Sequence, residues 1–137
     1  MTSLFADTSA LYAAADRRED HHDPCRLAYE RALRSGDTIV TTELVIAELH
    51  ALAVRRSYPD AALEIVRRLT TTGRVDVESA GRTRLANAID LLASRLGRPY
   101  SLADAVSFVV MRELGIDRAL TLDADFAAEG FEVVPAA

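Results

Sequence analysis

The chain has 137 residues, half of them hydrophobic, which suits one domain with a single core over residues 1–137. No stretch approaches the roughly 20 apolar residues that cross a bilayer, and no segment has the pattern of a secretory signal, so we expect a cytoplasmic protein without a membrane partner. The net charge of −5 differs from the basic footprint of most nucleic-acid-binding domains, although bound cations would invert the charge at an acidic cluster.

Strand and helix signals alternate along the chain. In chain order we expect strand 3–6, helix 9–15, helix 24–35, strand 38–40, helix 42–56, helix 59–71, strand 74–77, helix 81–95, helix 101–114, strand 119–122 and strand 131–134. Asp23 and Pro24 are expected as the N-cap and first position of the second helix, and Thr41 or Thr42 as the cap of the third. This alternation predicts an α/β fold with a mostly parallel sheet that helices cover on both faces.

Four acidic residues lie inside or beside apolar stretches, where an ionised carboxylate is costly: Asp7, Glu48, Asp104 and Asp123. Two follow predicted strands and two lie in the first turns of helices that follow capping residues. In a parallel α/β domain these positions share the carboxyl edge of the sheet, where ligands bind. Carboxylate oxygens are the ligands that Mg²⁺ and Mn²⁺ prefer, so the pattern predicts one site for divalent metal.

Each acid also has a structural alternative. Asp7 and Asp123 could cap helices, and Asp104 has the spacing of a capping box with Ser101. Glu48 lies between Leu44 and Leu52 on a helical wheel, which predicts that it faces the interior of the protein. A buried salt bridge, for example with Arg55, is the alternative role of Glu48.

Three further residues are expected to support the site. Thr8 or Ser101 could orient a carboxylate or a water molecule, and Asp125 is either a fifth carboxylate or a solvated cap. All 16 basic residues are arginines, which suit phosphate binding, but the sequence does not indicate which of them contact a substrate.

Four motifs together resemble the PIN-domain family, and within it the VapC-type toxins of toxin–antitoxin pairs. They are Phe5-Ala6-Asp7-Thr8-Ser9-Ala10-Leu11, Thr41-Thr42 with Ala47-Glu48-Leu49, Ser101-Leu102-Ala103-Asp104-Ala105-Val106-Ser107, and Leu120-Thr121-Leu122-Asp123-Ala124-Asp125-Phe126. The resemblance implies a three-layer α/β/α fold with a five-stranded parallel sheet. It also implies a metal-dependent ribonuclease, a homodimer and a small antitoxin protein that inhibits it.

We therefore expect an endoribonuclease toxin that hydrolyses RNA phosphodiester bonds with one or two Mg²⁺ or Mn²⁺ ions held by the four carboxylates. A PIN-fold nuclease outside a toxin–antitoxin pair and a non-catalytic binding module remain as alternatives. A phosphoacceptor signalling domain is disfavoured, because such domains need a lysine near the phosphoryl group and the chain contains none.

Overall fold

The computed structural model describes residues 2–136; Met1 and Ala137, the two ends of the predicted domain, lie outside the described residues. The described chain contains five strands: β1 (Ser3–Ala6), β2 (Thr38–Thr42), β3 (Val75–Glu78), β4 (Arg118–Leu120) and β5 (Glu132–Val134). Its helices are α1 (Thr8–Ala15), α2 (His22–Arg34), α3 (Glu43–Arg56), α4 (Pro59–Thr71), α5 (Gly81–Ala93), α6 (Leu102–Leu114) and α7 (Ala124–Ala128).

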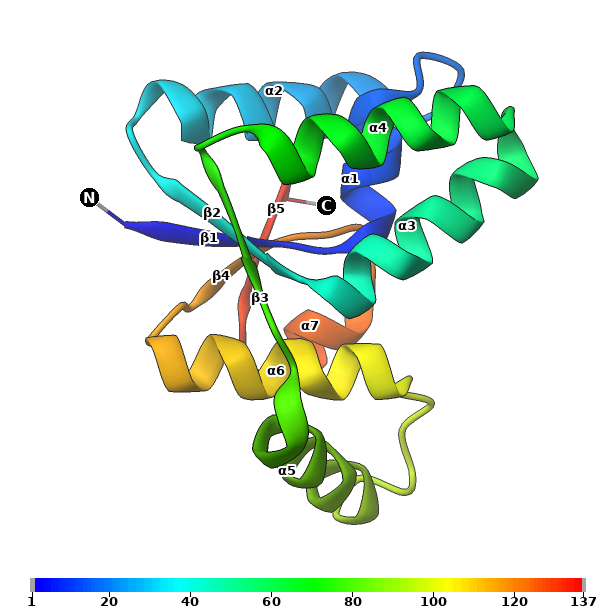
Figure 1. Ribbon diagram of the computed structural model, residues 1–137. Coiled ribbons are helices and arrows are strands. Elements are labelled where there is room, and N and C mark those ends of the chain that lie inside the picture. Colours follow the sequence, from blue (N-terminus) through cyan, green and yellow to red (C-terminus); the bar gives the residue numbers. More distant parts are fainter. Residues whose placement is uncertain (1, 137) are drawn as a thin grey trace.

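The strands form one parallel sheet in the order β3-β2-β1-β4-β5. Helices α1 to α4 cover one face and α5 to α7 cover the other, so the predicted three-layer α/β/α fold is confirmed (Figure 1). The central strand β1 is buried from Leu4 to Ala6, as expected for a strand covered on both faces. None of the helices within residues 2–136 is long and apolar enough to cross a membrane.

The start of α2 differs from the prediction. The helix begins at His22, so Asp23 and Pro24 lie inside its first turn and Asp23 is not the N-cap. The imidazole Nδ1 of His22 lies 2.8 Å from the carbonyl oxygen of Ala13, which fixes the first turn against α1. Proline is tolerated here because backbone N–H groups in a first turn have no partner within the helix.

Two other elements near the carboxyl edge of the sheet refine the prediction. Thr42 caps α3 as expected, since its Oγ1 accepts a hydrogen bond from the Val45 amide at 3.2 Å. Strand β4 ends at Leu120 rather than at residue 122, and the short helix α7 begins directly after Asp123. This helix is absent from the predicted elements, although the alternative role of Asp123 as a helix cap agrees with it. A helix of five residues is too short for apolar periodicity to reveal it.

A buried carboxylate holds the layer of α5, α6 and α7 together. The Glu129 side chain, only 3% exposed, accepts hydrogen bonds from the Tyr100 hydroxyl at 2.8 Å, from Arg112 at 3.1 Å and from Arg95 at 3.2 Å. Burial alone would raise the pKa of Glu129, but these donors outweigh burial and hold the pKa below its ordinary value. The network joins the end of α7 to α6 and to the loop before it.

Replacing Glu129 with glutamine should destabilise the protein by about 2 kcal/mol at pH 7, because two guanidinium groups lose their charged acceptor. A carboxyl with a lowered folded-state pKa contributes stability above its unfolded pKa, near 4.3, and loses it as the pH falls. The difference between wild type and Glu129→Gln in urea unfolding should therefore shrink below about pH 4.

Glu64→Gln is the matched control, because Glu64 pairs with Arg68 on the exposed surface of α4. It should cost at most about 0.5 kcal/mol. Equal losses for Glu129→Gln and Glu64→Gln would show that the buried network adds no stability of its own.

Candidate active site

The carboxyl edge of the sheet contains a pocket of about 440 Å³ with an acidic wall. Its lining residues are Asp7, Thr8, Ser9, Glu48, Ala51, Leu52, Arg55, Ser101, Asp104 and Asp123. The structure thus brings the four carboxylates that the sequence singled out into one pocket. They come from the end of β1, from α3, from the first turn of α6 and from the turn between β4 and α7.

Asp7 is the buried member of this group, with 5% of its surface exposed. It occupies the N-cap position of α1, but its side chain makes no capping hydrogen bond, so capping does not explain it. Instead its Oδ2 accepts hydrogen bonds from the hydroxyl of Thr121 at 2.8 Å and from that of Ser9 at 3.2 Å. These two hydroxyls fix the orientation of the carboxylate.

Burial raises the pKa of Asp7 from its ordinary value of 3.8 to about 6. The hydrogen bond from Thr121 and the backbone amide of Thr8 oppose this shift, while the charges of Asp104 and Asp123 add to it. An ionised Asp7 is therefore held in the folded protein at a cost, and a cation in the pocket would remove that cost.

Asp104 both caps a helix and lines the pocket. It forms the predicted capping box with Ser101: the Ser101 amide donates to Asp104 Oδ2 at 3.0 Å, and the Asp104 amide donates to Ser101 Oγ at 3.0 Å. Burial raises the pKa of the half-buried Asp104 carboxyl, and the charges of Asp123 and Glu48 raise it further. The capping box thus fixes the position of this carboxylate at the start of α6.

Asp123 lies in the turn that precedes α7, and Asp125 lies in the first turn of this helix. Asp123 Oδ1 accepts a hydrogen bond from the Asp125 amide at 2.9 Å, so Asp123 is the cap of this helix. One carboxylate oxygen from each of Asp104, Asp123 and Asp125 lies within 4.8 Å of the other two. The pKa of Asp125 is raised by burial and by the charge of Asp123. Asp125 therefore belongs to this group of three carboxylates, although it does not line the pocket.

Glu48 lies in the pocket but does not face the core, so that part of the prediction was wrong. The buried residues of α3 are Val45, Leu49 and Ala53, one position further along the helix than the stripe that contains Glu48. Glu48 is exposed, and its Oε1 accepts a hydrogen bond from the Thr8 hydroxyl at 3.0 Å. Among the ion pairs of residues 2–136, none joins Glu48 to Arg55.

Ser9 and Thr121 support the site, but sequence reasoning did not assign them this role. Besides holding Asp7, the Ser9 hydroxyl accepts from the Leu122 amide and the Thr121 hydroxyl accepts from the Asp123 amide, each at 2.9 Å. They therefore join the ends of β1 and β4. The available signal was their spacing: each lies two residues from a candidate carboxylate, and Thr121 is a polar residue between two leucines.

The donor set suits a divalent cation. It consists of carboxylate oxygens held by hydroxyl and amide groups, which is the chemistry of magnesium and manganese sites. The described residues that line the pocket offer no sulfur or imidazole. Burial raises the pKa values of Asp7 and Asp104, and among the ion pairs of residues 2–136 none involves either carboxylate. A hard divalent cation would supply positive charge there.

Replacing Asp7 with asparagine should stabilise the metal-free protein at pH 7.5. A carboxyl with a raised folded-state pKa disfavours folding above that pKa, and a displacement from 3.8 to about 6 corresponds to about 3 kcal/mol. Urea unfolding in EDTA should show a gain for Asp7→Asn that disappears as the pH falls from above 6 toward 4. The exposed Asp117, replaced in the same way, is the charge-matched control; a gain no larger than that of Asp117→Asn would contradict the raised pKa.

Comparison with known proteins agrees with this geometry. The PIN domain family matches residues 4–131. The 23S rRNA-specific endonuclease VapC20 of Mycobacterium tuberculosis (strain H37Rv) is 33% identical over 134 residues, which cover 96% of this chain and 98% of VapC20. The ribonuclease VapC26 of the same strain is 28% identical over 120 residues, which cover 88% of this chain and 86% of VapC26.

The fold comparison gives the same result. The crystal structure of Mycobacterium tuberculosis VapC20, described as a sarcin–ricin loop cleaving toxin, matches with a TM-score of 0.84 and 31% identity over 94% of this chain and 96% of that one. The predicted resemblance is thus confirmed, and the chain belongs to the PIN-domain family, among its VapC-type members.

Proposed function

We propose that this protein is a metal-dependent endoribonuclease and the toxin of a type II toxin–antitoxin pair. It would consist of one domain and act in the cytoplasm. The observation that carries the proposal is the convergence of Asp7, Glu48, Asp104 and Asp123 from separate elements on one pocket in a VapC-type chain. Helix capping accounts for Asp104 and Asp123 one at a time, but it does not account for the position of all four carboxylates around one pocket.

The four carboxylates would hold one or two Mg²⁺ or Mn²⁺ ions, with Asp125 beside them. Such an ion supplies Lewis-acid chemistry, which polarises a phosphoryl oxygen and makes water acidic enough to give up a proton near neutral pH. The protein's part is to hold the ligands still. Thr121 and Ser9 orient Asp7, the capping box orients Asp104, and Thr8 holds Glu48. Supporting hydrogen bonds of this kind commonly change metal affinity or activity 10- to 100-fold.

We infer the substrate and the partners of this protein from its VapC-type relatives. VapC20 is named for its action on 23S rRNA, and its structure is described as that of a sarcin–ricin loop cleaving toxin. A structured loop of ribosomal RNA is therefore the first substrate to test for this chain. The protein would form a homodimer. It would also form a complex with an antitoxin protein that blocks the pocket. A PIN-fold nuclease outside a toxin–antitoxin pair is the alternative, and a non-catalytic binding module is disfavoured by the carboxylate pocket.

Asp7→Asn and Asp104→Asn should each reduce RNA cleavage by at least about 100-fold and leave the fold intact, because each removes a charged ligand of the proposed ion. The measurement is cleavage of purified ribosomal RNA in Mg²⁺ and, separately, in Mn²⁺. Asp117→Asn, an equal change of charge outside the pocket, should cleave like wild type. EDTA should stop cleavage; full activity of both pocket variants, or cleavage in EDTA, would refute the proposed site.

Expression in cells should produce a small number of new RNA ends, because a VapC-type toxin is expected to cut selectively. Sequencing of RNA 5′ ends from induced cells would locate them. Coexpression with the product of a short neighbouring reading frame should remove the cuts and restore growth. Cuts that persist with every neighbouring product would favour a nuclease outside a toxin–antitoxin pair.

A further inference from the structure

An acidic pocket alone repels RNA, so the substrate needs positive charge close to the carboxylates. Nine of the 16 arginines use their guanidinium groups in hydrogen bonds or ion pairs within residues 2–136. The other seven have no such side-chain bond to a described residue: Arg17, Arg31, Arg34, Arg55, Arg67, Arg82 and Arg98. Of these seven arginines, those that lie close to the pocket can bind the phosphates of an RNA substrate there.

Among residues 2–136, Arg55 is the one basic residue that lines the carboxylate pocket. It lies on α3 seven residues after Glu48, which is two helical turns along the same face. It is exposed and forms no ion pair with Glu48, so its guanidinium is available without breaking a bond inside the protein. This places a free positive charge on the wall formed by α3.

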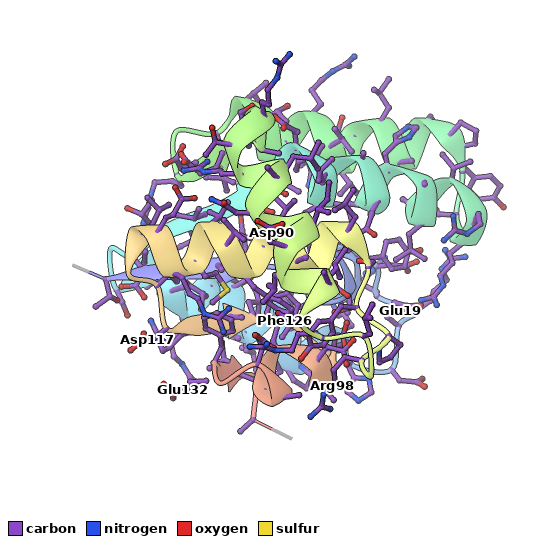
Figure 2. The ribbon with its side chains drawn as sticks, turned by 90° about the horizontal axis from the view of Figure 1, so that it is seen from below. Glu19, Asp90, Arg98, Asp117, Phe126 and Glu132 are labelled. Atoms are coloured by element: carbon purple, nitrogen blue, oxygen red, sulfur yellow. The ribbon has the colours of Figure 1, made fainter. Side chains whose placement is uncertain are left out.

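Arg98 lies in the loop between α5 and α6, next to the other side of the cluster. This loop belongs to the helical layer opposite α3, and both lie near the carboxyl edge of the sheet (Figure 1). Figure 2 shows Arg98 beside α7, the helix that carries Asp125. Arg98 is exposed, and it lies three residues before Ser101, which lines the carboxylate pocket. The loop therefore carries a positive charge next to the carboxylates.

We propose that the RNA strand crosses the pocket from α3 to the α5–α6 loop, and that Arg55 and Arg98 bind phosphates on the two sides of the cleaved bond. The proposal rests on the ribonuclease function and adds the path of the substrate. Guanidinium groups bind phosphate oxygens through paired, charge-assisted hydrogen bonds, which fix the strand as well as attract it. Such contacts carry no base preference, so selectivity comes from elsewhere.

The test measures binding of a 5′-fluorescein-labelled single-stranded oligo(U) of 20 nucleotides by anisotropy, over a series of salt concentrations. The parent is Asp104→Asn, which should not cut the RNA, and a gel after each titration verifies that the probe is intact. Arg55→Gln, Arg98→Gln and their double variant are made in this parent. Arg67→Gln is the control, because Arg67 has no side-chain bond within residues 2–136 and lies on α4, outside both α3 and the α5–α6 loop.

Arg55→Gln and Arg98→Gln should each weaken binding about 10-fold, as expected for one charged hydrogen-bonded contact. The slope of log Kd against log salt should fall by about 0.7 for each variant and about 1.4 for the double variant, since each contact releases counterions from one phosphate. Arg67→Gln should match the parent, and Arg55→Lys should retain the salt slope. Unfolding curves in urea verify that the variants remain folded.

The proposed RNA path would be overturned if Arg55→Gln and Arg98→Gln weakened binding no more than Arg67→Gln does. It would also be overturned if the parent did not bind the RNA. Cleavage of ribosomal RNA by the wild type tests the proposed function separately. Cleavage without any dependence on Arg55 and Arg98 would refute only the path. Binding that depends on both arginines, in a wild-type protein that never cleaves, would refute only the ribonuclease activity.

Discussion

Asp7 lies buried at the end of the central strand, where its burial, with a smaller effect from the charges of Asp104 and Asp123, raises its pKa. A carboxylate in this position is costly, and the chain retains it with hydrogen bonds rather than with a paired arginine. The surroundings of Asp7 follow from this constraint. The hydroxyls of Ser9 and Thr121 both donate to its Oδ2, and they accept hydrogen bonds from the backbone amides of Leu122 and Asp123. A shortage of positive charge is thus built into the pocket, and it is what a divalent cation would relieve.

The parallel sheet makes this arrangement possible. Strands β1 and β4 are neighbours and end at the same edge, so residues 114 positions apart in sequence share a hydrogen bond there. Helices α3 and α6 begin at that edge and supply Glu48 and Asp104. The layer beneath is held by the Glu129 network, which ties α6 to the end of α7. Carboxylates carried on rigid elements need little reorganisation when they bind an ion, which is the condition for effective electrostatic stabilisation.

Much of the fold and of the carboxylate set could be predicted from the sequence, because both depend on local signals. Pro59 and Gly115 mark the ends of helices, and acids within apolar runs stand out wherever the chain folds. The errors came from features that local patterns leave open. The helical wheel of α3 wrongly predicted that Glu48 lies on the buried face. This helix has two partly apolar faces, one packed on the core and one lining the pocket, and Glu48 lies on the second. The roles of Ser9 and Thr121 depend on strand neighbours, which only the sheet order defines.

The central claim is that this carboxylate edge is a divalent-metal site, and a crystal soaked in Mn²⁺ tests it most directly. Anomalous scattering locates manganese independently of the protein coordinates. A peak in the pocket, with oxygens of Asp7, Asp104 or Asp123 about 2.1 to 2.2 Å from it, is the predicted result. An anomalous map from a fully soaked crystal without a peak between these carboxylates, or with manganese bound only at other surface acids, would contradict it.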